Sequence, residues 1–344
     1  MKETTTKKIN WVSILQGWSM LLVVIGHAGL SKIPRNPDEP VISLIEYLIY
    51  SFHMPLFMMV SGYLFYLTRV KTPVGYCAML LDKLKRLGIP YIAFTAMTLL
   101  LKSIFNEYMV RQTSLSFKEV ANAFLYPTNN PLGELWFIAT LLLIFVLTPL
   151  LKWALRNPLY SLIAGLLAGL VHFFPGSIDL FCLSLVARYV IWFFIGLLIS
   201  RYKMETWLDT WGSFVFTGIA FILTFCLSHL YGWKEVDFIV TLTGCLFSYS
   251  LALKLDKFIP SLFHTFRSYT FQIYLLGIFF QIAFKILYQK MLYPHGYAVA
   301  FGLCILLGLY APVLISLGVR KINNHYLNLM VGMSSQRRLA RRTA

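Results

Sequence analysis

The chain has 344 residues, of which 58% are hydrophobic and 13% are charged, and its mean hydropathy is +0.69. A soluble domain is usually about half apolar and a quarter charged, so the excess apolar surface must face lipid. The formal net charge is +16, but the basic residues occupy short gaps and leave no soluble module to bind nucleic acid. The five cysteines form no CxxC pair, which favours neither a zinc site nor a disulfide framework.

Ten apolar runs along the chain predict an all-α, polytopic bundle of about ten transmembrane helices, because a helix needs roughly twenty apolar residues to cross the hydrocarbon core. The second run is longer than one crossing and contains Pro55, which favours a kink because proline lacks a backbone donor. The first run has no small-residue cleavage site, so no cleavable signal peptide is expected. The predicted spans lie near residues 11–30, 41–67, 88–105, 134–151, 159–174, 182–200, 211–231, 238–253, 269–289 and 297–319.

Lys and Arg are concentrated in alternate gaps between these runs. The basic gaps include the N-terminal segment 1–9 and the tail 320–344, whereas the other gaps hold few basic residues, and Lys285 falls near a span end. By the positive-inside rule both termini are predicted to be cytoplasmic, in a multi-pass protein of the plasma (bacterial inner) membrane. No gap is long enough for a soluble domain, so residues 1–344 are expected to form a single membrane domain in contact with lipid.

Five ionisable residues stand inside the predicted spans: His27, Glu46, His53, Glu134 and Arg188. A charge at the centre of a bilayer costs about 2.5 kcal/mol or more, so such residues point to a site. The predicted topology places them in the outer half of the membrane, where neighbouring helices would bring them into one pocket open to the outside. A histidine held by a carboxylate can deprotonate a hydroxyl for attack on an acyl carbonyl.

Simpler interpretations of the same residues stay open. His27 lies near a span end, where a histidine costs little. Glu46 and Arg188 could form a structural ion pair that joins two spans. Glu134 could cap the start of its span, where a carboxylate suits the helix dipole.

Two further features of the sequence have both a topological and a functional interpretation. The basic residues Lys83, Lys85 and Arg86 satisfy the positive-inside rule, and they could also attract phosphates from the cytoplasm. Trp136 fits an interfacial aromatic belt. No nucleophile elbow and no phosphate-binding loop of the Walker type is present, so serine-hydrolase chemistry and ATP hydrolysis lack support.

An ordered set of short motifs resembles the acyltransferase-3 family of membrane O-acyltransferases, in particular its fucose-4-O-acetylase-like branch. The resemblance covers nearly the whole chain, and the order of the motifs makes it specific although each is weak alone. The stretches that carry it are Ile9–Gly17, Val23–His27, Ser51–Phe57, Val60–Phe65, Lys83–Pro90, Leu135–Phe137, Phe193–Gly196 and Ser268–Leu276.

Two positions depart from the family's pattern. The family usually has an arginine in the first span, separated by ten residues from a histidine, and here Gln16 replaces that arginine while His27 is retained. The family usually has a histidine after the Tyr-Leu-Leu of a late span, and here that position is Gly277. Gln16 donates hydrogen bonds but carries no charge, so the departures put the level of activity in question.

The resemblance implies transfer of an acyl group, usually acetyl from acetyl-CoA, to a sugar hydroxyl in a surface polysaccharide or a lipid-linked glycan precursor. It implies acyl-CoA as the donor substrate, and no metal is expected. His27 is expected to be the general base or acyl-relay residue. The remaining expected site residues are His53, Glu46 and Glu134 to orient the acceptor, Arg188 to stabilise charge at the acyl oxygen, and Gln16, Ser61, Lys83, Lys85, Arg86 and Trp136 on the donor side.

Two other classes of function compete with the acyltransferase. A proton-coupled transporter or lipid-linked glycan flippase would use His27, Glu46 and His53 as a proton relay. The absence of a matching pair of Gly- or Pro-broken spans in the two halves argues mildly against it. A receptor or scaffold with decayed enzymatic ancestry would account for Gln16 and Gly277.

Overall fold

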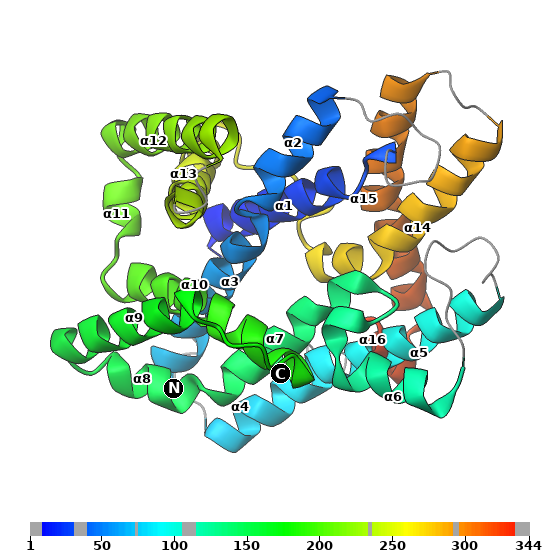
Figure 1. The fold of residues 1–344 in the computed structure, drawn as a ribbon, viewed down its shortest axis with the longest axis horizontal. Helices are drawn as coiled ribbons and strands as arrows, with labels where there is room; N and C mark the ends of the chain where they lie inside the picture. The colour runs from blue at the N-terminus through cyan, green and yellow to red at the C-terminus, as the bar shows by residue number, and fades with distance from the viewer. Residues whose placement is uncertain are drawn as a thin grey trace. The chain divides into compact units, whose positions relative to one another are not determined.

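The computed structural model describes residues 9–30, 40–72, 75–104, 115–232, 236–291 and 296–333. All regular structure in these residues is helical, which confirms the all-α prediction (Figure 1). Among the described residues, 7 helices are long and apolar enough to cross a membrane, and one pair bent by 56° forms a further candidate span. Two shorter apolar helices, Asn10–Gly26 and Pro158–Phe173, occupy the remaining predicted ranges.

The chain divides into two compact units, and each unit collects segments that are distant in sequence. The first unit comprises Met1–Tyr63 and Leu198–Leu314, and the second comprises Leu64–Leu197 and Ile315–Ala344. Helices of the first unit are α1 (Asn10–Gly26), α2 (Pro40–Tyr50), α3 (His53–Phe65), α11 (Glu205–Leu208), α12 (Trp211–Tyr231), α13 (Asp237–Phe258), α14 (Thr270–Met291) and α15 (Tyr297–Ile322), of which α3 and α15 end in the second.

The second unit has shorter helices and more turns. Its elements are η2 (Tyr66–Val70), α4 (Tyr76–Lys83), η3 (Leu84–Gly88), α5 (Ile89–Ile104), α6 (Phe117–Leu125), η5 (Pro127–Asn129), η6 (Gly133–Leu135), α7 (Trp136–Val146), α8 (Thr148–Ala154), α9 (Pro158–Phe173), η7 (Leu180–Cys182), most of α10 (Leu183–Arg201) and α16 (His325–Met330). The bent pair is α7 and α8. Pro149 has no N–H for the carbonyl of Phe145, and the hydroxyl of Thr148 donates to that carbonyl at 2.7 Å instead.

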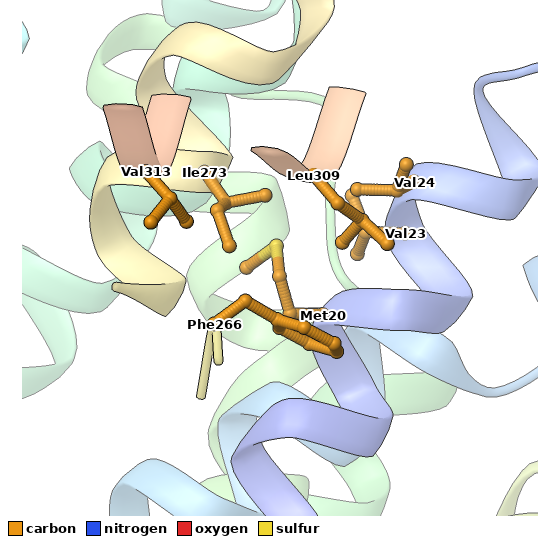
Figure 2. Close-up of a cluster of buried hydrophobic side chains, with 7 residues drawn as sticks. All are labelled: Met20, Val23, Val24, Phe266, Ile273, Leu309 and Val313. Atoms are coloured by element: carbon orange, nitrogen blue, oxygen red, sulfur yellow. The ribbon is translucent and has the colours of Figure 1, made fainter. Parts of the chain in front are cut away.

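The core of the first unit forms around α1, which is apolar on nearly every face and packs against α2, α13 and α14. A buried cluster joins the C-terminal half of α1 to α14, to α15 and to the turn before α14 (Figure 2). Its members are Met20, Val23, Val24, Phe266, Ile273, Leu309 and Val313. This packing ties the end of α1, which carries His27, to two helices far along the chain.

Helices α14 and α15 approach closely at a pair of glycines. A Cβ atom on Gly277 would lie 2.8 Å from the carbonyl oxygen of Gly308. A Cβ atom on Gly308 would lie 2.9 Å from both the Gln281 side chain and the Val24 side chain of α1. Small residues allow helices in a membrane to approach at this distance, so the glycine at position 277 serves the packing of α14 on α15.

The long second apolar run is interrupted between α2 and α3, just before Pro55. Proline has no N–H to donate to the carbonyl of Ser51, four residues earlier. That carbonyl instead accepts a hydrogen bond of 2.6 Å from the hydroxyl of Thr241 on α13. A neighbouring helix thus satisfies the backbone group that the proline leaves open, and His53 begins α3 directly after the interruption.

Candidate functional site

His27 directly follows the last residue of α1, and side chains from other helices bind the carbonyl groups at this helix end. Gln281 of α14 donates to the carbonyl of Val24 at 2.8 Å. Tyr50 of α2 donates to the carbonyl of Gly26 at 3.1 Å, and Lys285 of α14 donates to the carbonyl of His27 at 2.6 Å. The final carbonyls of a helix lack partners within the helix. Tyr50 and Lys285 bind the two carbonyls at the turn and so fix the position of His27, whereas Gln281 binds a carbonyl earlier in α1.

The imidazole of His27 is oriented by Tyr50. The phenol oxygen of Tyr50 lies 3.2 Å from Nδ1 of His27 and 3.1 Å from the carbonyl oxygen of Gly26. A phenol has one proton, and when that proton is donated to the carbonyl, the oxygen accepts from Nδ1–H. This arrangement leaves Nε2 as the basic nitrogen of His27, which is the tautomer that a general base needs.

His53 also contacts the Tyr50 ring and is buried, with 3% of its surface exposed. The Tyr50 ring makes edge contacts with both imidazoles, with centroids 5.8 Å from His27 and 5.0 Å from His53. Nδ1 of His53 bonds the carbonyl of Ile49 at 2.9 Å. His53 therefore caps the C-terminal end of α2. Because Nδ1 carries the proton in this bond, Nε2 is the basic nitrogen of His53.

The carboxylate of Glu46 lies directly on the turn that follows His27. A Cβ atom on Gly29 would fall 1.7 Å from Oε1 of Glu46, so the carboxylate occupies the space that a side chain would fill. The first unit thus brings together three of the residues that the sequence singled out, namely His27, Glu46 and His53. Tyr50 joins them as a fourth polar side chain.

The N-terminal half of α1 contacts the turn before α14. Gln16 is half-buried, and a Cβ atom on the adjacent Gly17 would lie 3.0 Å from Phe263 and 3.1 Å from Arg267. The guanidinium of Arg267 donates to the side chain of Asn10 at 2.8 Å. This contact holds the 259–269 segment against the start of α1.

Ser61 lies elsewhere in the first unit, on α3. Its side chain is half-buried. Its expected role on the donor side stays a prediction.

The basic residues of the second unit lie where α4 passes into η3. The ammonium of Lys83 stands over the ring of Phe145 at 4.2 Å, whereas Lys85 and Arg86 are exposed. Close by in the chain, Arg69 forms an ion pair of 3.0 Å with Asp82. The exposed pair is therefore better placed to meet a soluble anion than Lys83.

The other predicted residues of the second unit lie at the start of α7 and on α10. Glu134 lies in η6, and the ring of Trp136 packs against Tyr189 of α10 with centroids 5.1 Å apart. Arg188 precedes that tyrosine, is exposed, and its backbone carbonyl bonds Nδ1 of His172. Because Glu46 belongs to the first unit and Arg188 to the second, the expected ion pair and the expected single pocket stay predictions.

Comparison with known proteins identifies the family to which the chain belongs. The model of an acyltransferase domain matches residues 9–317 of the chain. The chain belongs to the acyltransferase-3 family. This acyltransferase-family protein is also similar to nodulation protein NolL of Sinorhizobium fredii (strain NBRC 101917 / NGR234), with 33% identity over 138 residues. The aligned part is 40% of this chain and 34% of the relative, so the match spans about a third of that protein's length. No solved structure matches the chain.

The crossing of α14 and α15 explains why this acyltransferase-3 protein departs from the family pattern at Gly277. A histidine at position 277 would collide with the backbone of Gly308, so the close crossing of α14 and α15 requires the glycine. The family match and the apolar helices together make the chain a multi-pass membrane protein. In the described part of the chain, no three His, Cys, Asp or Glu side chains come together as ligands for a metal ion.

Sequence reasoning missed three side chains at the end of α1, namely Tyr50, Gln281 and Lys285. Gln281 and Lys285 are separated by one helical turn in a largely apolar span, so they share a face of α14. That spacing was the available signal, because polar residues on one face of a membrane helix usually meet a polar partner. Tyr50 gave no comparable signal, since tyrosines are common where a span meets the interface.

Proposed function

We propose that this member of the acyltransferase-3 family transfers an acetyl group from acetyl-CoA to a sugar hydroxyl of a surface polysaccharide or of its lipid-linked precursor. The observation that carries the proposal is the arrangement around His27, with Tyr50 on Nδ1 and Glu46 on the following turn. A base oriented by a second side chain is the usual device for activating a hydroxyl.

In the proposed reaction, Nε2 of His27 accepts the proton of the acceptor hydroxyl. The hydroxyl oxygen attacks the acetyl carbonyl, the carbon–sulfur bond of the thioester breaks, and the leaving thiolate receives the proton from the imidazolium. Glu46 and His53 orient the sugar, and Arg188 and Glu134 of the second unit act on the acyl oxygen and on the acceptor. These roles follow from residue type and from the predicted depth in the membrane.

On the donor side we assign the phosphates of acetyl-CoA to the exposed Lys85 and Arg86. Guanidinium and ammonium groups bind phosphate through charge-assisted hydrogen bonds. Lys83, whose ammonium is engaged with the Phe145 ring, supports the helix that carries them. We also assign Gln16, Ser61 and Trp136 to the binding of the donor.

The test compares surface glycans and lipid-linked precursors by mass spectrometry. The strains carry the intact gene, a deletion, and the deletion complemented with His27→Ala or with the control His264→Ala, which changes an exposed histidine of the 259–269 segment. An acetyl mass should appear with the intact gene and the control. His27→Ala should lower the rate of acetyl transfer by about 10²–10⁴-fold, so its acetyl mass should fall towards that of the deletion.

Identical glycans in all four strains would contradict the proposal. In that case a transporter or flippase remains, for which His27→Ala would instead abolish the movement of a substrate that is not covalently changed. Loss of the acetyl mass in both histidine variants would show that protein level, and not the chemistry of His27, had been changed.

A further inference from the structure

Lys285 is a charged side chain in the interior of an apolar helix. It lies in α14, a candidate membrane span of 22 residues, and only 5% of its surface is exposed. An ammonium group is expensive to bury unless it is paired or hydrogen-bonded. The position of Lys285 therefore needs a reason that packing alone does not supply.

Its ammonium is directed at the end of α1. Nζ donates to the carbonyl oxygen of His27 at 2.6 Å, and Gln281, one turn earlier on the same face of α14, donates to the carbonyl of Val24. The C-terminal end of a helix carries partial negative charge, which a cation stabilises better than a neutral donor. Lys285 thus caps α1 at the residue that bears the imidazole.

The turn after His27 is held by α15 and α14 as well. The amide of Leu30 donates to the hydroxyl of Tyr297 at 3.3 Å. Leu30 is fully buried against Tyr288 of α14 and Ala300 of α15. Both ends of the 27–30 turn therefore contact α14, the Leu30 end also contacts α15, and Lys285 provides the charged contact at the His27 end.

We propose that Lys285 is a positioning residue for His27. It acts through the backbone carbonyl of His27 and holds the 27–30 turn in the geometry that sets the imidazole against Tyr50. The kinetic part of this inference rests on the proposed acetyl transfer, whereas the capping part does not.

The experiment uses the full-length protein in detergent micelles and membranes, with Lys285→Met, Lys285→Arg and the matched control Gln281→Met. Hydrogen exchange of the peptide that contains residues 27–30 reports the cap without any activity. Incorporation of labelled acetyl from acetyl-CoA into membrane glycan reports kcat and the KM for acetyl-CoA. Lys285→Gln replaces Lys285→Met if the methionine variant does not accumulate as folded protein.

Lys285→Met should speed hydrogen exchange at residues 27–30 by about tenfold or more. It should also lower kcat at least tenfold with little change in KM, since a positioning group acts on the chemical step. Lys285→Arg should restore most of the slow hydrogen exchange and most of kcat. Gln281→Met should change kcat by less than about threefold, because Gln281 binds the carbonyl of Val24 and not that of His27.

Unchanged exchange at residues 27–30 in Lys285→Met would overturn the inference, whatever the activity. A kcat equal to that of the unchanged protein, combined with faster exchange, would also overturn it, since the cap would then have no effect on the reaction. Suppose that the unsubstituted protein transfers no acetyl group and that Lys285→Met still speeds hydrogen exchange at residues 27–30. That result would support the cap and refute the proposed function.

Discussion

At the scale of single residues, the side chains around His27 have distinct tasks. Tyr50 contacts both imidazoles and the carbonyl of Gly26. His53 is buried and closes the end of α2, so its structural task is visible although its part in binding an acceptor stays a proposal. The hydrogen bond made by one ring nitrogen of a histidine sets the tautomer, and so decides whether the other nitrogen can act as a base. The hydroxyl of Tyr50, which lies on Nδ1 of His27, is therefore the group to remove in a direct test.

Tyr50→Phe should lower kcat for acetyl transfer by about 10–100-fold, by analogy with the loss of side chains that orient functional histidines. The ring contacts survive in phenylalanine, whereas the bond to Nδ1 of His27 is lost. Tyr47→Phe is the control, because Tyr47 lies one turn earlier on α2 and contacts Phe225 and His229 through its ring. Equal kcat values for the two variants would refute the orienting role.

At the scale of elements, backbone groups and small residues decide how the helices of the first unit meet. The interruption between α2 and α3 depends on Pro55 and on a hydroxyl from α13. The crossing of α14 and α15 depends on Gly277 and Gly308. Both features hold helices that contact α1, so their loss should affect stability first and activity through it.

Thr241→Val should lower the free energy of unfolding by about 1–3 kcal/mol, because it leaves the carbonyl of Ser51 without its donor. Adding Pro55→Ala restores an N–H four residues after Ser51 and should offset part of the loss. Thermal unfolding in micelles of the two single variants and the double variant measures the coupling, which should be about 0.5–3 kcal/mol. Strictly additive effects would show that the two residues do not serve the same carbonyl.

Gly277→Ala should destabilise the protein by about 1–3 kcal/mol, since the new methyl group meets the backbone of Gly308. Gly302→Ala on α15 is the control, because a Cβ atom there meets no atom within 4 Å, and it should change stability by less than about 0.5 kcal/mol. Gly277→His, which restores the residue usual in the family, should be less stable than Gly277→Ala and no more active. A histidine variant with a higher melting temperature and higher kcat would contradict the packing explanation.

At the scale of the whole molecule, the two compact units divide the predicted site residues between them. His27, Glu46 and His53 lie in the first unit, whereas Glu134 and Arg188 lie in the second. In the part of the chain that the structure describes, ten apolar helical segments, counting the bent pair as one, agree with a multi-pass protein, as do the alternating basic gaps. The predicted orientation has its own test, because each loop has an assigned side of the membrane.

Reporter fusions should show alkaline phosphatase activity after Gly232, which is predicted to be outside, and fluorescence of green fluorescent protein after Lys203 and after Ala344, which are predicted to be inside. The reason is the excess of Lys and Arg in the inside gaps. Fluorescence after Gly232 together with phosphatase activity after Ala344 would invert the proposed topology.

Much of this protein could be predicted from its sequence because hydropathy is a local property. The ten helical segments, the proline-associated interruption and the ionisable residues His27, Glu46 and His53 within apolar runs each depend on a short window of residues. The ordered motifs identified the family. The contacts of Tyr50, Gln281 and Lys285 could not be predicted in this way. They depend on which face of α14 meets the end of α1, and a pattern of apolar residues gives the depth of a side chain in the membrane but not its direction around the helix axis. Gly277 shows the same division, since its departure from the family pattern was evident in the sequence, whereas its cause, the backbone of Gly308 at 2.8 Å, exists only where two helices cross.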